Sequence, residues 1–242
     1  MKKFKMITIF ALVVSAFVLT GCYKEEDSRG LTRDIREFMP ENILKTVEDL
    51  GMPIYGGNTP PDITGTFFMS PSILKASNFD RPTDIGSRFT DATIIYSDQD
   101  NKDLTVKVFQ DNLRDGSDGG NGTGGFIVGK DKNFTVFVKL VDVDKHGHKA
   151  TAAMLYSGTM SDSGIKDFHI SVVMVDNGGN PDGDLIDNGH CRLIYDSDGF
   201  SEKVTSSKSS AQSEIPSETI FPILKTFYLF KSCARHVSGI KK

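Results

Sequence analysis

The chain contains no tryptophan, only three cysteines, and no excess of basic residues. The absence of tryptophan excludes any site that depends on an indole N–H donor. The formal net charge is −4, from 28 basic and 32 acidic residues, and no stripe of Lys and Arg with interleaved aromatics is present. Because nucleic-acid binding needs such a basic field, the composition argues against that class of function.

The common catalytic signatures are also missing. There is no Gly-X-Ser-X-Gly elbow, no His-Glu-X-X-His pair, and the glycine-rich segment Asp115 to Gly125 lacks the spacing of a phosphate-binding loop. His190 and Cys191 are adjacent, but neighbours in a strand point to opposite faces, so the imidazole cannot readily take the thiol proton. The sequence therefore favours a non-enzymatic protein, with residues 115 to 125 as a loop at one end of the fold.

Residues 1 to 21 have the pattern of a signal peptide. A basic start, Met1 to Lys5, precedes an apolar run from Met6 to Leu19 and small residues up to Gly21. Since a helix that crosses the hydrocarbon needs about 20 apolar residues, this run is too short for a permanent anchor.

The cleavage site, Leu19-Thr20-Gly21-Cys22, resembles the lipobox of bacterial lipoproteins. The resemblance implies a diacylglycerol and an acyl chain such as palmitate on Cys22, and a location at the outer membrane. Each buried methylene contributes about 0.8 kcal/mol, so two or three acyl chains give a stable anchor. The alternative is a secreted protein that has a cysteine at this position by chance.

The residues after the lipidation site, Tyr23 to Asp27, are basic and then acidic. They resemble the export tag of Bacteroidota lipoproteins, which implies display on the cell exterior; the alternative is a solvated charged tether. We expect residues 22 to 39 to form the tether, with a short helix possible over Leu31 to Phe38. Cys191 and Cys233 either pair as a disulfide or remain two thiols.

The remaining chain suits one mainly β domain. Pro40, apolar residues at helical spacing and Gly51 predict one short amphipathic helix, and Ser72 to Ala76 a turn or short helix. Alternating apolar residues between short polar turns then predict eight strands. They are 62–69, 88–96, 104–109, 125–130, 133–143, 149–158, 166–176 and 190–195.

Eight strands joined in sequence favour an up-and-down antiparallel barrel, because closure removes both exposed edges. Partial closure or a two-sheet sandwich is the alternative. We expect the helix and barrel to span residues 40 to 205, followed by a linker and tail over 206 to 242.

Three segments carry a family resemblance. Pro40 to Pro71, Gly125 to Phe137 and Tyr195 to Glu202 resemble uncharacterised Bacteroidota lipoproteins that are built on a lipocalin-like barrel. Gly65-Thr66-Phe67 stands where lipocalins have Gly-X-Trp. The resemblance implies a calycin-type barrel and transfers no catalytic residue.

Metal ligands are suggested at two places. His146 and His148 are two apart and could face the same way, and Asp182 and Asp184 lie in a loop crowded with oxygen donors. Neither place shows a complete ligand set, since the acidic loop lacks the spacing of an EF-hand. The alternatives are a solvated hairpin turn and a long polar connection.

Two functions remain open. The first is a surface-anchored binding module for a small apolar ligand, with an inner barrel face drawn from Phe67, Phe109, Phe137 and Val173 or their alternating neighbours. The second is a structural or interaction subunit of a cell-surface assembly, with a filled barrel. The sequence identifies no ligand-binding residue.

Overall fold

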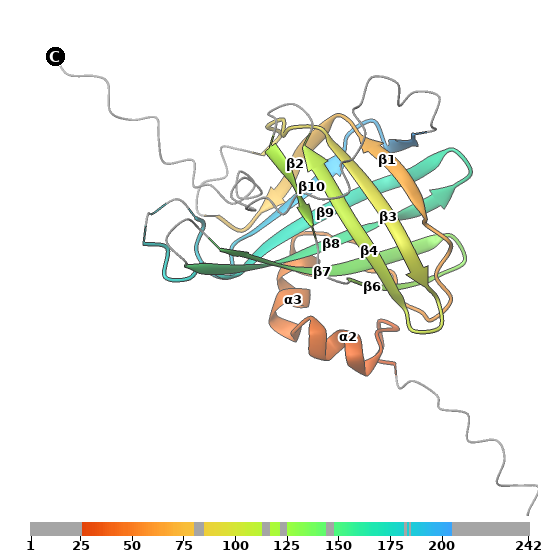
Figure 1. The fold of residues 1–242 in the computed structure, drawn as a ribbon, viewed down its shortest axis with the longest axis horizontal. Helices are drawn as coiled ribbons and strands as arrows, with labels where there is room; N and C mark the ends of the chain where they lie inside the picture. Colours follow the sequence, from red (N-terminus) through yellow and green to blue (C-terminus); the bar gives the residue numbers. More distant parts are fainter. Residues whose placement is uncertain are drawn as a thin grey trace, which may run out of the picture.

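The computed structural model describes residues 26–79, 85–112, 117–121, 125–143, 148–181, 183 and 185–204. Two helices precede a large sheet in this part of the chain (Figure 1). The helices are α2 (Arg33–Phe38) and α3 (Glu41–Asp49). The strands are β1 (Gly65–Met69), β2 (Ser72–Ser77), β3 (Ala92–Asp100), β4 (Thr105–Asn112), β5 (Ser117–Asn121), β6 (Gly125–Lys130), β7 (Asn133–Val143), β8 (Lys149–Ser161), β9 (Gly164–Asp176), β10 (Cys191–Asp196) and β11 (Phe200–Lys203).

The strands form one antiparallel sheet that closes on itself. Its order is β11-β1-β3-β4-β6-β7-β8-β9-β10-β2, with β5 paired to β4 off this path. A further pairing of β11 with β9 joins β11, β1, β3, β4, β6, β7, β8 and β9 into a ring of eight. The predicted mainly β, antiparallel fold is thus confirmed, and its sheet contains a ring of eight strands with β2, β5 and β10 outside it.

The ring closes at a different strand from the one expected. The predicted last strand, 190–195, corresponds to β10, whereas β11 is the strand that bridges β9 and β1. The expected loop over 115–125 also contains β5. The turn or helix expected at 72–76 is wrong as well, because this segment is strand β2, paired with β10. The conformation of a short segment depends on the backbone partners available to it, and β10 pairs with five of the six residues of β2.

A buried carboxylate holds the corners between β1 and β2 and between β10 and β11. The Ser70 backbone N–H donates to Asp196 Oδ2 at 3.3 Å, and the Ser201 hydroxyl donates to the same oxygen at 2.6 Å. The Ser197 N–H donates to the Pro71 carbonyl at 3.1 Å. These bonds tie the two corners together where the ring closes.

Alternating residues fill the inside of the ring. Phe67 faces this inner core, as do Val136, Val138, Val172 and Met174. The expected inner residues Phe137 and Val173 are wrong, because both belong to a second core on the outside of the sheet. Phe109 is half-buried and belongs to neither core. Their alternating neighbours therefore line the interior, which was the other reading of the same pattern.

The second core lies between the helices and the outer face of the sheet. In α3, Ile43, Leu44 and Val47 are buried against residues such as Leu155 and Val173, and Figure 1 shows both helices on one outer side. The predicted amphipathic helix is confirmed. Its apolar stripe packs on strands rather than facing solvent.

The segment before α3 packs on the domain too. Leu31, Ile35 and Met39 are fully buried in the second core. The expected tether over 22–39 is therefore wrong for residues 26–39, because their apolar residues repeat at the spacing of one helix face and find a sheet to cover.

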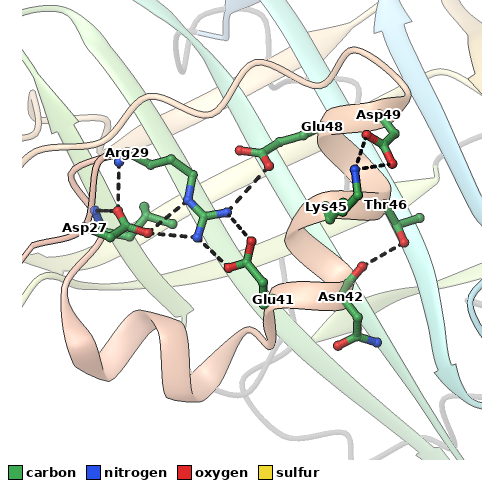
Figure 2. A network of polar contacts seen from close by, with 9 residues as sticks. Asp27, Arg29, Glu41, Asn42, Lys45, Thr46, Glu48 and Asp49 are labelled. Atoms are coloured by element: carbon green, nitrogen blue, oxygen red, sulfur yellow. Dashed lines mark hydrogen bonds and ion pairs between the residues drawn. The ribbon is translucent and has the colours of Figure 1, made fainter.

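A charged network fastens this N-terminal segment to α3 (Figure 2). The Arg29 guanidinium bonds to Asp27 at 2.8 Å and to Glu41 at 2.6 Å, and lies 3.5 Å from a Glu48 oxygen. Gly56 passes so close to the Arg29 carbonyl that any Cβ there would collide with it. The network and this close approach hold residues 26–32 against the body of the fold.

Candidate functional site

The two ends of the ring differ in their connections. Short turns at 101–104, 131–132 and 162–163 link strands at one end. The strand ends that lead into the longer connections, β2 to β3, β4 to β6, β7 to β8 and β9 to β10, lie at the opposite end, as the strand registers require. We call the latter the long-loop end, and in a ring of strands such an end is where a ligand usually enters.

An aromatic cluster occupies the interior. Tyr96 is its centre, with ring centroids 6.0 Å from Phe67, 6.2 Å from Phe134 and 6.2 Å from Tyr156, and Tyr156 stacks on Phe168 at 6.4 Å. Edge-to-face and offset contacts at such distances are favourable. These five residues, the interior aromatic cluster, come from β1, β3, β7, β8 and β9.

The hydroxyl of Tyr96 has no hydrogen-bond partner within the described part of the chain. The residue is 1% exposed, so water does not reach the group from outside. Burial, and then the neighbouring Tyr156, raise the pKa of Tyr96 well above its ordinary value. The group is therefore a neutral O–H donor, held in an apolar interior without an acceptor.

Tyr156 is as deeply buried, but its hydroxyl is paired. It donates to Gln110 Oε1 at 3.0 Å and lies 3.7 Å from Met154 Sδ. Burial raises the pKa of Tyr156 as well. Gln110 is half-buried on β4, two residues before that strand ends.

The unpaired Tyr96 hydroxyl is the chemically notable feature of the inner core. The buried Ser157 and Ser171 hydroxyls also lack a partner in the described part of the chain, but these residues alternate with the inner-core residues of β8 and β9. Leaving a hydroxyl unpaired in an apolar environment costs about 1–3 kcal/mol by protein mutational data. A molecule that brings an acceptor to Tyr96 would recover that free energy. The arrangement can thus hold and orient a ligand.

A second polar cluster lies on the outside of the ring. Lys75 Nζ is 2.8 Å from His169 Nε2, and His169 Nδ1 is 2.7 Å from the Asp167 carbonyl oxygen. Since a carbonyl only accepts, Nδ1 carries the proton and Nε2 accepts from Lys75. Burial first, and Lys75 next among the lowering effects, lower the pKa of His169. Both ring nitrogens have partners, so this cluster serves the structure.

Of the four predicted metal ligands, only His148 lies within the described residues. His148 is exposed at the start of β8, and His146, Asp182 and Asp184 lie outside the described residues. No group of three or more His, Cys, Asp or Glu in the described ranges could hold a metal ion. In the loop after β9, Asn180 bonds to both the N–H and the carbonyl of Leu185, which makes it a structural side chain.

His190 and Cys191 face different surroundings, as expected. The Cys191 thiol is fully buried in the second core, where burial raises the pKa of Cys191 to about 12. The His190 ring lies against Phe79, with centroids 4.6 Å apart. Cys191 is unpaired, while Cys22 and Cys233 lie outside the described residues.

No helix in the described part is long and apolar enough to span a membrane.

Sequence reasoning missed Tyr96, Tyr156 and Gln110. The signal was present, because Gln110 continues the inner period of Val106 and Val108 and is the polar member of that row. A polar residue in an inward-facing row marks a candidate site.

Comparisons with family models, with curated proteins and with solved structures give no match to this chain. The candidate site therefore depends on its geometry alone.

Proposed function

We propose that this protein is a lipoprotein anchored through Cys22 in the outer membrane, facing the cell exterior, and that it binds a small apolar ligand without catalysis. The ligand occupies the interior of the ring of strands, which we take to be a lipocalin-like barrel. The observation that carries the proposal is the buried and unpartnered hydroxyl of Tyr96.

Three features support a binding site in the interior. The inner core is apolar over most of its surface, the strand ends that lead into the longer connections gather at one end, and the Tyr156 hydroxyl already has its partner in Gln110. Small-molecule sites commonly combine an apolar lining with a few placed polar groups. A site with one free donor matches that combination.

The second candidate, an interaction subunit with a filled interior, is favoured by a different observation. Phe67, Phe134 and Phe168 are fully buried at 0% exposure and pack into the same cluster. Rings of eight strands lie at the border between a filled core and a cavity for one ligand. In this case the unpaired Tyr96 hydroxyl lowers the stability of the folded protein and serves no ligand.

Native mass spectrometry of the full lipoprotein from its own host tests the choice. The protein is compared before and after extraction with organic solvent. A bound small molecule that is lost on extraction supports the binding module. An identical mass in both samples, together with unchanged unfolding temperature, supports the filled interior.

The anchor has its own test. Replacing Cys22 by Ser should move the protein from the membrane fraction to the soluble fraction and abolish labelling by radioactive palmitate. Protease treatment of intact cells then reports exposure on the exterior. Retention of the Cys22→Ser variant in the membrane would contradict the anchor.

A further inference from the structure

We propose that the ligand is an uncharged apolar molecule with a carbonyl or ether oxygen, and that this oxygen accepts a hydrogen bond from Tyr96. The inference rests on the proposed function, because it names the ligand class of the same interior site. It excludes free fatty acids and other anions as the ligand.

The polar group of the ligand must be an acceptor. The Tyr96 hydroxyl is a neutral O–H that has no partner, and the neighbouring Tyr156 hydroxyl already donates to Gln110 at 3.0 Å. A phenol is a better donor than acceptor, and the pair of tyrosines leaves one donor unused. A ligand oxygen with a lone pair complements it.

The acceptor must also be neutral. In the described part of the chain the Tyr96 hydroxyl has no partner and the Tyr156 hydroxyl bonds only to Gln110 and Met154, so no cation is bound to either hydroxyl. An anion placed against Tyr96 would be buried without a counter-charge, which costs several kcal/mol. A carbonyl oxygen satisfies the same hydroxyl without that cost.

Two cations, Arg192 and Lys203, lie over aromatic rings. Arg192, at the long-loop end, has its guanidinium carbon 4.9 Å from the Phe79 ring centroid and 5.8 Å from that of Phe89. Lys203 Nζ lies 5.8 Å from the Phe67 centroid and belongs to the exposed end of β11. Both cations interact with aromatic faces, and no hydrogen bond joins either of them to the Tyr96 or Tyr156 hydroxyl in the described part of the chain.

The residues that line the interior favour a ligand whose main part is apolar, and they can adapt to ligands of different shapes. Met69, Met154 and Met174 are buried in the same inner core as the aromatic cluster. Unbranched thioether side chains adapt to irregular partners and contact aromatic rings favourably. A flexible chain or a small ring system that carries one oxygen therefore suits the site.

Calorimetric titration of the full lipoprotein in lipid nanodiscs tests the inference, with empty nanodiscs as the reference for lipid partitioning. The probes are 2-nonanone, 1-nonene and nonanoate, which share one chain length and differ in the polar group. We expect 2-nonanone to bind most tightly. Tyr96→Phe should weaken 2-nonanone about 2- to 10-fold, the contribution of one neutral hydrogen bond, and leave 1-nonene unchanged.

Tyr195→Phe is the matched control, because this tyrosine stacks on His169 on the outside of the ring and should not alter any affinity. If nonanoate binds most tightly, or if Tyr96→Phe weakens all probes equally, the ligand class is wrong while the binding module stands. If no probe binds to the wild-type protein, the binding module fails and the ligand class fails with it.

Discussion

Tyr96→Phe and Tyr156→Phe should shift stability in opposite directions, although both remove one oxygen from the same cluster. The Tyr96 hydroxyl has no partner, so removing it recovers the desolvation cost of about 1–3 kcal/mol that burial imposes on the folded state. The small cavity left by the missing oxygen offsets part of that gain. We expect the free energy of unfolding to rise by about 0.5–2 kcal/mol. In Tyr156 the hydroxyl bonds to Gln110, so its removal should cost about 0.5–1.5 kcal/mol.

The measurement is urea unfolding of the full protein after ligand extraction, followed by circular dichroism. With a slope of about 1–3 kcal/mol per molar urea, these changes move the midpoint by several tenths molar in opposite directions. The two substitutions change volume equally at 1% and 2% exposure, so packing effects largely cancel in the comparison. Equal destabilisation by both would show that the Tyr96 hydroxyl gains a partner on folding and would refute the reasoning.

Four other predictions concern single groups. Burial lowers the pKa of His169, so the unfolded chain takes up a proton below about pH 6.5 before the folded chain does. The free energy of unfolding should therefore fall as the pH drops below about 6.5. His169→Gln should flatten that part of a profile of unfolding temperature against pH. Burial raises the pKa of Asp196, so stability should be lost as the pH rises from about 4 towards the raised value, and Asp196→Asn should remove that loss in the same profile. The buried Cys191 thiol, with its pKa raised to about 12, should resist iodoacetamide at pH 8 until urea unfolds the chain, as peptide mass spectrometry would show. Leu44→Ala should lower the free energy of unfolding by about 2–5 kcal/mol in urea titrations, because the side chain is fully buried beneath α3.

Most of the strand pattern was predictable because period-two alternation is a local property. The predicted strands 133–143 and 166–176 coincide with or lie within β7 and β9. Strand β2 was missed because its conformation depends on β10, more than a hundred residues later in the chain. The ladder, and not the local sequence, decides such a short segment.

Alternation also leaves the direction of each face open. Phe137 and Val173 look as suited to an interior as their neighbours, but α2 and α3 cover their side of the sheet. Residues 26–39 decide which face is buried on the outside. The apolar side chains of Leu31, Ile35 and Met39 pack on one face of the sheet, and together with that face they form the second core. Which residues line the ring is therefore decided by elements outside it.

The isolation of Tyr96 follows from register, which no local pattern reveals. In the ladder, Tyr96 lies opposite Gly65 on one side and Val108 on the other, and neither has a side-chain acceptor. Tyr156 lies opposite Val136 and Ile170, which are equally apolar, yet its hydroxyl reaches Gln110 on β4. Closure of the ring thus brings a polar partner to one tyrosine and withholds it from the other. Since folding alone gains nothing from an unpaired buried hydroxyl, the ligand that we propose would supply the partner that the core does not.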